Sequence, residues 1–205
     1  MQYTVTSLEW KEKGKVCLVL NERITLWLYR GELREFSLQT GSVFEEETYQ
    51  KLLHEVLGRR ATKRAMHLLE RQDRTEYQLR QKLSQGQYPP EAIEDAISYV
   101  DSYHYLDDER YARTFISFHK DRRSRLRIRM DLQRRGIASE VIARCLEEEF
   151  DTDEMEQIME LLEKKQYVQN SQDQAARRKI YQFLLRRGFK SADILRAMDK
   201  AVRST

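Results

Sequence analysis

The chain has 205 residues, of which 40% are hydrophobic and 35% are charged. It contains only seven glycines and two prolines, which excludes collagen-like and Pro/Gly-rich disordered classes and favours long helices with large charged surfaces. No apolar run approaches the roughly 18 residues of a membrane-spanning helix, and the N-terminus lacks a signal-peptide pattern. We therefore expect a cytoplasmic protein that does not associate with membranes. Cys17 and Cys145 lack a metal-binding spacing, which predicts two core residues.

The net charge is only +3, but the charges are distributed unevenly along the chain. Residues 120–135 include eight basic and two acidic side chains, and residues 177–190 include six basic and no acidic ones. Between them, residues 140–163 include ten acidic side chains and one arginine. Two interpretations are open: solvated helix faces with Arg–Glu pairs inside the chain, or a basic surface for an anionic partner.

The first 40 residues predict a small β element. Apolar side chains follow a period of two over 16–20 and 24–29, and Asn21-Glu22-Arg23 suits a hairpin connection. Further turns are expected at 30–32 and 40–42, where glycines occur. Because a sheet this short is not stable alone, we expect it to pack on the helical pattern that opens at Tyr49.

Beyond residue 60 the apolar period is close to 3.6, and an internal repeat is visible. When Leu83, Leu132 and Leu184 are aligned, apolar residues recur four positions before each leucine and five, ten and fourteen positions after it. A glycine precedes the apolar residue at plus five in each copy. The shared unit is a helix, a glycine-containing turn and a second helix, with another amphipathic helix before each pair. The second helices are expected to begin at Pro89-Pro90, Ser139 and Ser191.

These patterns predict a mainly all-α fold, in which tandem three-helix repeats form an elongated curved array behind a small N-terminal β element. The expected domains are 1–58 for the β-hairpin plus helix, 59–106 for repeat 1, 107–152 for repeat 2 and 153–205 for repeat 3.

Motifs for catalysis are not visible. The four histidines form no metal-ligand spacing, and no Gly-rich phosphate loop is present. The acidic run Asp107-Asp108-Glu109 could hold a divalent metal, but its place favours the N-cap and first turn of a helix. Asp73 followed by Glu76 is interpreted as a capping box. We therefore expect a protein that is not an enzyme and binds no cofactor or metal.

The strongest functional signal is an arginine-rich helix predicted from about residue 123 to 135. On a helical wheel, Ile128 and Leu132 mark the buried stripe, while Leu126 and Met130 lie opposite and must meet another helix or a partner. Arginines occupy both flanks, which suits either phosphate or an acidic protein face. We predict that partner-binding residues lie in four places. The first flank of the helix carries Arg122, Arg125 and Arg129, and the second flank carries Arg123, Arg127 and Arg134. The end of the helix carries Arg135, and the third repeat carries Arg186, Arg187 and Lys190.

Aromatic side chains could add base stacking to this surface. Single-strand recognition requires exposed aromatic rings between cations. The available rings lie in apolar periodic contexts, which favours positions in the core; they are Trp10, Trp27, Tyr103 and Tyr105.

Three segments resemble the RecX family of bacterial recombination regulators: Ala65-Met66-His67-Leu68-Leu69, Tyr105-Leu106-Asp107-Asp108-Glu109-Arg110-Tyr111-Ala112 and Asp131-Leu132-Gln133-Arg134-Arg135-Gly136-Ile137. The resemblance covers residues 61–150 well and 154–203 by repeat register. Where the family often carries Gly-Pro before the arginine-rich helix, this chain has Arg123-Ser124-Arg125-Leu126.

This resemblance implies a regulator that binds the RecA–DNA filament, lies in its groove and inhibits ATP hydrolysis and strand exchange. We expect the chain to be a monomer. Such a protein would regulate homologous recombination, DNA repair and the SOS response. The alternative is a helical-repeat protein whose ligand is nucleic acid itself, single-stranded or double-stranded, bound nonspecifically through its phosphates. Direct phosphate binding should weaken steeply with salt.

Overall fold

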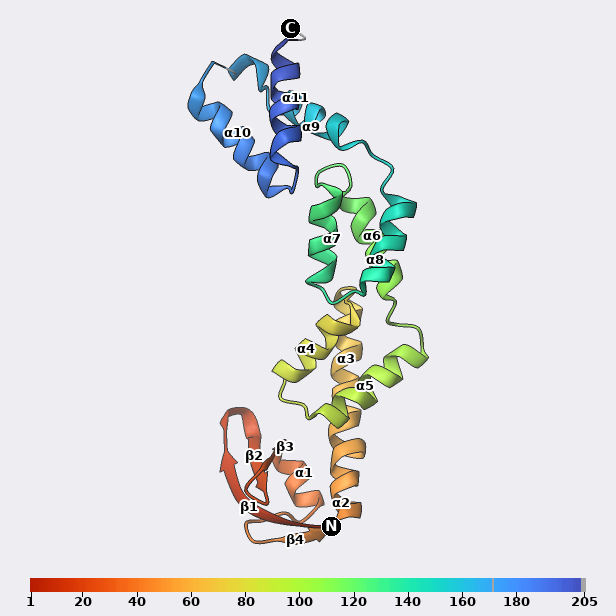
Figure 1. Cartoon of the computed structure of the whole chain (residues 1–205). Coiled ribbons are helices and arrows are strands. Elements are labelled where there is room, and N and C mark those ends of the chain that lie inside the picture. Colours follow the sequence, from red (N-terminus) through yellow and green to blue (C-terminus); the bar gives the residue numbers. More distant parts are fainter. Residues whose placement is uncertain (171, 204–205) are drawn as a thin grey trace. The chain divides into compact units, whose positions relative to one another are not determined.

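The computed structural model describes residues 1–170 and 172–203 (Figure 1). The chain divides into two compact units, Met1–Asp107 and Asp108–Thr205. The first unit contains an N-terminal sheet and one three-helix repeat, and the second contains two further three-helix repeats. The predicted fold class, mainly helical with a small β element, is therefore confirmed.

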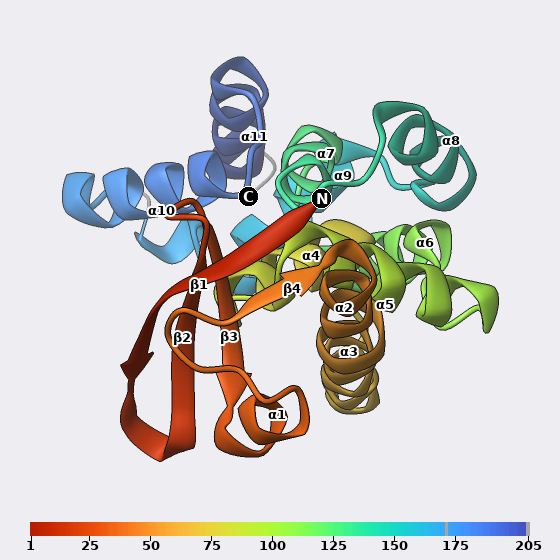
Figure 2. The same cartoon turned by 90° about the horizontal axis from the view of Figure 1, so that it is seen from below.

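The sheet has four antiparallel strands in the order β3-β2-β1-β4 (Figure 2). Their bounds are β1 Gln2–Trp10, β2 Lys15–Leu20, β3 Ile24–Tyr29 and β4 Val43–Glu45. The predicted hairpin joins β2 to β3 through residues 21–23, between the paired Leu20 and Ile24. Its residues Asn21 and Glu22 have positive φ of 48° and 59°. The sequence pattern does not reveal β1, because a register shift between Val5 and Ser7 interrupts its period of two.

The turn expected at 30–32 is instead the beginning of a helix, α1 (Arg30–Glu35). Its side chain Glu32 accepts a hydrogen bond from the Tyr29 backbone N–H at 2.6 Å, which caps the first turn. The same carboxylate accepts from Arg60 Nη1 at 2.8 and 2.9 Å, so α1 is tied to the helix that follows. The turn at 40–42 forms as expected, with Gly41 at φ 86°.

A continuous helical stretch leads from the sheet into the first repeat. It consists of α2 (Glu46–Gln50), a π-helical segment (Lys51–Gly58) and α3 (Arg59–Arg71), and the backbone stays helical at each junction. The boundary expected between residues 58 and 59 therefore lies inside a helix. A side chain at Gly58 would collide with Asp95, so the glycine permits close packing there.

The first repeat is completed by α4 (Glu76–Gln85) and α5 (Pro90–Ser102). The capping box predicted at Asp73 and Glu76 is wrong. Thr75 is the N-cap: its hydroxyl accepts from the Gln78 backbone N–H at 3.2 Å, and the Gln78 side chain accepts from the Thr75 N–H at 3.3 Å. Thr75, and not Asp73, caps α4 because the Thr75 backbone is extended directly before the first helical residue. Thr75 is completely buried there.

The second unit consists of two more three-helix repeats. Repeat 2 contains α6 (Asp108–His119), α7 (Arg125–Gln133) and α8 (Ser139–Glu149). Repeat 3 contains α9 (Glu154–Lys164), α10 (Gln174–Arg186) and α11 (Ser191–Arg203), with a 3-10 turn at Val168–Asn170. In the part of the chain that the structure describes, no strand occurs beyond residue 61.

The aligned leucines occupy equivalent core sites. Leu83, Leu132 and Leu184 are all completely buried. One hydrophobic cluster extends through the sheet and the first repeat, whereas the second and third repeats each have a cluster of their own. Cys17 and Cys145 are buried free thiols, as expected.

The turn after each aligned leucine has the same hydrogen bonds. The residue at plus five donates its N–H to the leucine carbonyl at 3.3–3.4 Å, which is the Schellman arrangement. In repeats 2 and 3 the left-handed residue of this turn is Gly136 or Gly188. In repeat 1 it is Gln87, at φ 66°, while Gly86 has an ordinary negative φ. The aligned glycine therefore occupies the left-handed position in repeats 2 and 3, whereas in repeat 1 it lies one residue before that position.

Candidate anion-binding site

The start of α7 is fixed against the turn that follows α10. The Ser124 side chain caps α7 by accepting from the Arg127 N–H at 3.1 Å, and its own N–H donates to the Arg187 carbonyl at 3.0 Å. A Cβ on Gly188 would lie 2.6 Å from Ser124 Oγ and 2.6 Å from Arg127 Cβ. Ser124 thus caps the N-terminus of α7 and contacts the neighbouring repeat.

This contact brings predicted residues from two repeats to one hollow. Arg123 and Arg127 from repeat 2 and Arg186 and Arg187 from repeat 3 line a hollow of about 280 Å³, together with Phe183. We call these four residues the arginine cluster. The pair Arg123 and Arg127 lies about sixty positions before the pair Arg186 and Arg187 in the sequence, so only the fold places the two pairs together.

The positive charge of the arginine cluster exceeds the negative charge of the carboxylate that pairs with it. Asp131, which is 5% exposed, accepts from Arg123 Nη1 at 2.8 Å and from Arg127 Nε at 3.2 Å. It is the only carboxylate that forms an ion pair with the cluster among the described residues. The acidic stretch that follows α7 is used elsewhere: Glu148 and Glu149 pair with Arg113.

Arg187 experiences this excess charge directly. Its guanidinium packs over the Phe183 ring at 4.3 Å and donates to the Arg122 carbonyl. Burial, and then the neighbouring charges of Arg122 and Arg123, lower the pKa of Arg187. Because a guanidinium nevertheless stays protonated near neutral pH, the cluster keeps the positive charge that Asp131 does not offset.

The remaining predicted residues differ in accessibility. Arg122, Arg129, Arg134 and Lys190 are exposed, and Arg125 is half-buried beside Glu154, which accepts its backbone N–H at 2.8 Å. Arg135 instead has a structural position: its guanidinium lies 4.5 Å from the Phe115 ring centre and donates to the Tyr111 hydroxyl and the Asp131 carbonyl.

Leu126 and Met130 are left on the surface of α7, with exposures of 53% and 39%. The helical wheel left two outcomes open for Leu126 and Met130, contact with another helix or with a partner. Among the described residues, no other helix covers them.

The aromatic residues expected in the core are mostly exposed. Trp10 and Tyr103 are each 57% exposed and Tyr105 is 46% exposed, so the core prediction is wrong for these three. Trp10 lies at the end of β1, beyond the register shift, where Arg30 covers its ring at 5.5 Å. The two tyrosines follow the last turn of α5 and stack on each other with ring centres 6.0 Å apart.

The acidic run before α6 supports the helix. α6 begins at Asp108, and Glu109 pairs with Arg113 at 2.7 Å and also with Arg144. Hydrogen bonds from Arg113 and then from Arg144 lower the pKa of the Glu109 carboxyl. Over residues 1–170 and 172–203 no group of three or more His, Cys, Asp or Glu side chains is placed to hold a metal ion. Nor is any helix in those ranges long and apolar enough to span a membrane.

Models of three protein-family domains match the helical part of the chain. RecX, first three-helix domain, matches residues 61–99; RecX, second three-helix domain, matches 107–146; and RecX, third three-helix domain, matches 151–198. The chain belongs to the RecX family.

Relatives and solved structures agree with this assignment. The chain is 31% identical over 164 residues to the regulatory protein RecX of Caldanaerobacter subterraneus subsp. tengcongensis, covering 79% of this chain and 81% of that protein. It is 24% identical over 190 residues to the regulatory protein RecX of Clostridium perfringens strain 13, covering 90% of each.

Two crystal structures share the fold. One, of a regulatory protein RecX, covers 99% of this chain and 100% of its own, with a TM-score of 0.59 at 21% identity. The other, of RecX from Lactobacillus salivarius, covers 71% and 96%, with a TM-score of 0.57 at 22% identity. Arg123 and Arg127 lie in the second RecX domain and Arg186 and Arg187 in the third, so the arginine cluster is formed between two RecX domains.

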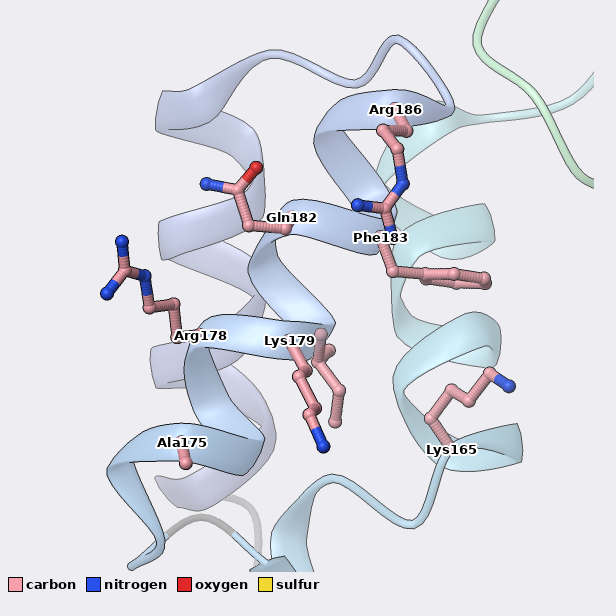
Figure 3. Close-up of a pocket in the computed structure, with 8 residues that line it drawn as sticks. Lys165, Ala175, Arg178, Lys179, Gln182, Phe183 and Arg186 are labelled. Carbon is pink, nitrogen blue, oxygen red and sulfur yellow. The ribbon is translucent and has the colours of Figure 1, made fainter.

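The arginine cluster has a neighbour that the sequence analysis did not select. A second hollow on α10 shares Phe183 and Arg186 with it and is also lined by Lys165, Arg178 and Lys179 (Figure 3). The available signal was the absence of any acidic residue from 177 to 190.

Proposed function

We propose that this chain is a non-enzymatic regulator that binds the groove of the RecA–DNA filament and inhibits recombinase ATPase and strand exchange, thereby regulating DNA repair, homologous recombination and the SOS response. The observation that supports it best is the convergence of four arginines from two RecX domains on one hollow with a single carboxylate. The identity of the partner rests on the family resemblance. We further propose that the chain acts as a cytoplasmic monomer without a cofactor.

The arginine cluster has the chemistry that such a partner needs. A guanidinium presents a planar fork that matches phosphate and carboxylate oxygens, and a filament offers both, on DNA and on protein. An anion that enters the hollow reduces the mutual repulsion of the four arginines, so its binding is favourable. Because the hollow lies at one place on the surface, this binding also favours one mode of docking over others.

Arg186 gives the cleanest test of this proposal, because it is exposed and forms no ion pair among the described residues. Arg186→Glu should weaken inhibition of the ATPase of a RecA–single-stranded DNA filament by about tenfold or more, equivalent to about 1.4 kcal/mol. Arg64→Glu on α3 makes the same charge change at an exposed site of the first repeat and should leave inhibition unchanged. Equal inhibition by both variants would contradict the role of the cluster.

The first flank of α7, formed by Arg122, Arg125 and Arg129, is tested separately. Arg122, Arg125 and Arg129 make no ion pair in the described part of the chain, so replacing all three by alanine should change stability by only about 0.5 kcal/mol each or less. If the flank contacts the filament, inhibition falls while the melting temperature stays the same. Wild-type inhibition by this variant would remove the flank from the binding surface.

The second candidate function is direct, nonspecific binding of DNA or RNA phosphates, and the charge excess of the cluster favours it equally. The two candidates differ in their need for protein. Direct binding predicts a log–log salt slope of about −0.9 per neutralised phosphate on duplex DNA and about −0.7 on single strands. The deciding comparison is recombinase-coated against bare single-stranded DNA at the same salt concentration.

A further inference from the structure

The second hollow, on α10, is large and lies inside the third repeat. Its volume is about 650 Å³, within the range of about 300–1,000 Å³ that small-molecule sites occupy. Figure 3 shows Phe183 extending from α10 towards α9, with Lys165 beside it at the end of α9 and Lys179 on the next turn of α10. We call this the α10 hollow.

Four cations line the α10 hollow, and no acidic residue does. They are Lys165, Arg178, Lys179 and Arg186. None of them forms an ion pair among the described residues, and α10 itself contains no acidic residue. Within the described ranges, the ion pair that α10 forms joins Arg177 to Asp199 of α11, outside the lining. An anion is therefore the complementary ligand.

The floor of the α10 hollow is apolar and contains an aromatic ring. Ile180 and Phe183 are only half-buried, and they line the hollow between the cations. Lys165 Nζ lies 5.1 Å from the Phe183 ring centre, and the Arg187 guanidinium lies at 4.3 Å. Lys165 is exposed, so its side chain can move aside and free its part of the ring at little cost.

A flat apolar floor next to cations suits one ligand class better than others. A carboxylate-rich peptide needs the cations but not the ring. A duplex offers phosphates, but its bases remain stacked inside the helix. An unpaired nucleotide uses both parts, because every base has a π-face and sits one sugar away from a phosphate.

We propose that the α10 hollow binds an unpaired nucleotide, with the base against Phe183 and Ile180 and the phosphate held by Lys165, Lys179 and Arg186. This deepens the second candidate function and rests on it, since it makes a nucleic-acid strand a direct ligand. The same chemistry is available from one nucleotide of a single strand or from a free nucleotide, and the experiment separates these sources.

The test measures binding of fluorescently labelled oligothymidylate to the full chain without recombinase. Phe183→Ala should weaken binding at least about fivefold, the lower end of a lost stacking contact. Lys179→Ala should weaken it too and should reduce the log–log salt slope by about 0.7. Lys63→Ala removes the same charge from an exposed site on α3 and should have no effect.

Because Phe183 also packs against the core of the third repeat, a folded aromatic replacement is needed. Phe183→Trp keeps the ring and should keep the affinity, and its fluorescence should be quenched when a base stacks on it. Thermal melting checks that every variant is folded. Thymidine monophosphate is titrated in parallel: quenching by both probes assigns a nucleotide site open to free ligands, and quenching by the oligomer alone assigns a strand site.

Three results would overturn the proposal. The first is wild-type affinity in a folded Phe183→Ala variant, which would reduce the hollow to a polyanion surface. The second is equal competition by polyglutamate, which would assign it to an acidic protein segment. The third is stronger binding of duplex than of single strands. None of these depends on recombinase, so filament inhibition can survive when this proposal fails.

Discussion

Gly188 is the residue on which the geometry of the arginine cluster depends most directly. Its φ of +89° is a left-handed conformation, in which an L side chain costs about 1–2 kcal/mol. In addition, a Cβ would lie 2.6 Å from both Ser124 Oγ and Arg127 Cβ and 3.2 Å from the Arg127 backbone nitrogen. Relieving such overpacking costs about 1–3 kcal/mol. Gly188→Ala should therefore lower the free energy of unfolding by about 2–5 kcal/mol.

Gly41 provides a matched control. Its φ is +86°, and nothing lies within 4 Å of the position a Cβ would take. Gly41→Ala should therefore show only the backbone cost of about 1–2 kcal/mol. Urea denaturation measures both variants, and hydrogen exchange at the Ser124 amide, which donates to Arg187, reports whether the repeats separate. Equal destabilisation of the two variants, with unchanged protection of Ser124, would refute the close approach of the two repeats.

Three further predictions concern capping, packing and pH. Thr75→Ala should cost about 1 kcal/mol of stability in urea denaturation, because the buried hydroxyl caps α4, whereas Asp73→Ala should cost little. Leu184→Ala should cost about 2–5 kcal/mol, and hydrogen exchange should increase first in the third repeat, which has its own hydrophobic cluster; uniform loss of protection over the chain would argue against this. Arg113 lowers the pKa of Glu109, so this carboxylate stabilises the fold above the ordinary glutamate pKa of about 4.3, and the contribution is lost as pH falls through the lower folded value. Acid titration of Glu109→Gln should show a smaller loss of stability over that interval.

Much of the fold follows from periodicity, because the repeat is set by local rules. The helix period, the apolar residue at plus five and the helix starts at Pro90, Ser139 and Ser191 all appear in the structure where the sequence predicts them. The errors are equally local. Gln87 occupies a left-handed position that pattern analysis assigns to a neighbouring glycine, and α1 depends on one side-chain cap at Glu32.

The candidate site could be predicted only in part. Composition singles out the arginines, since their charge density is visible in any window. Helical-wheel flanks, however, treat Arg123 and Arg127 as equivalent to Arg134, whereas the structure ties the first two to buried Asp131 and leaves the third exposed. Arg127 and Asp131 lie four positions apart on one helix, so that pair is within reach of a local pattern. The approach of Arg186 to Arg127 depends instead on contacts between residues about sixty positions apart, which no local pattern encodes.

Main-chain acceptors take three of the hydrogen bonds between repeats 2 and 3, besides the one from the Arg125 N–H to the Glu154 carboxylate. The carbonyls of Lys120, Arg122 and Arg187 accept from Gln157, Arg187 and Ser124 in turn, while the hydrophobic clusters of the two repeats stay separate. A carbonyl is present whatever side chain its residue carries. Mutations at residues 120 and 122 can therefore change charge and size without removing these acceptors, so the side chains of this surface can vary while the hydrogen bonds between the two repeats are kept.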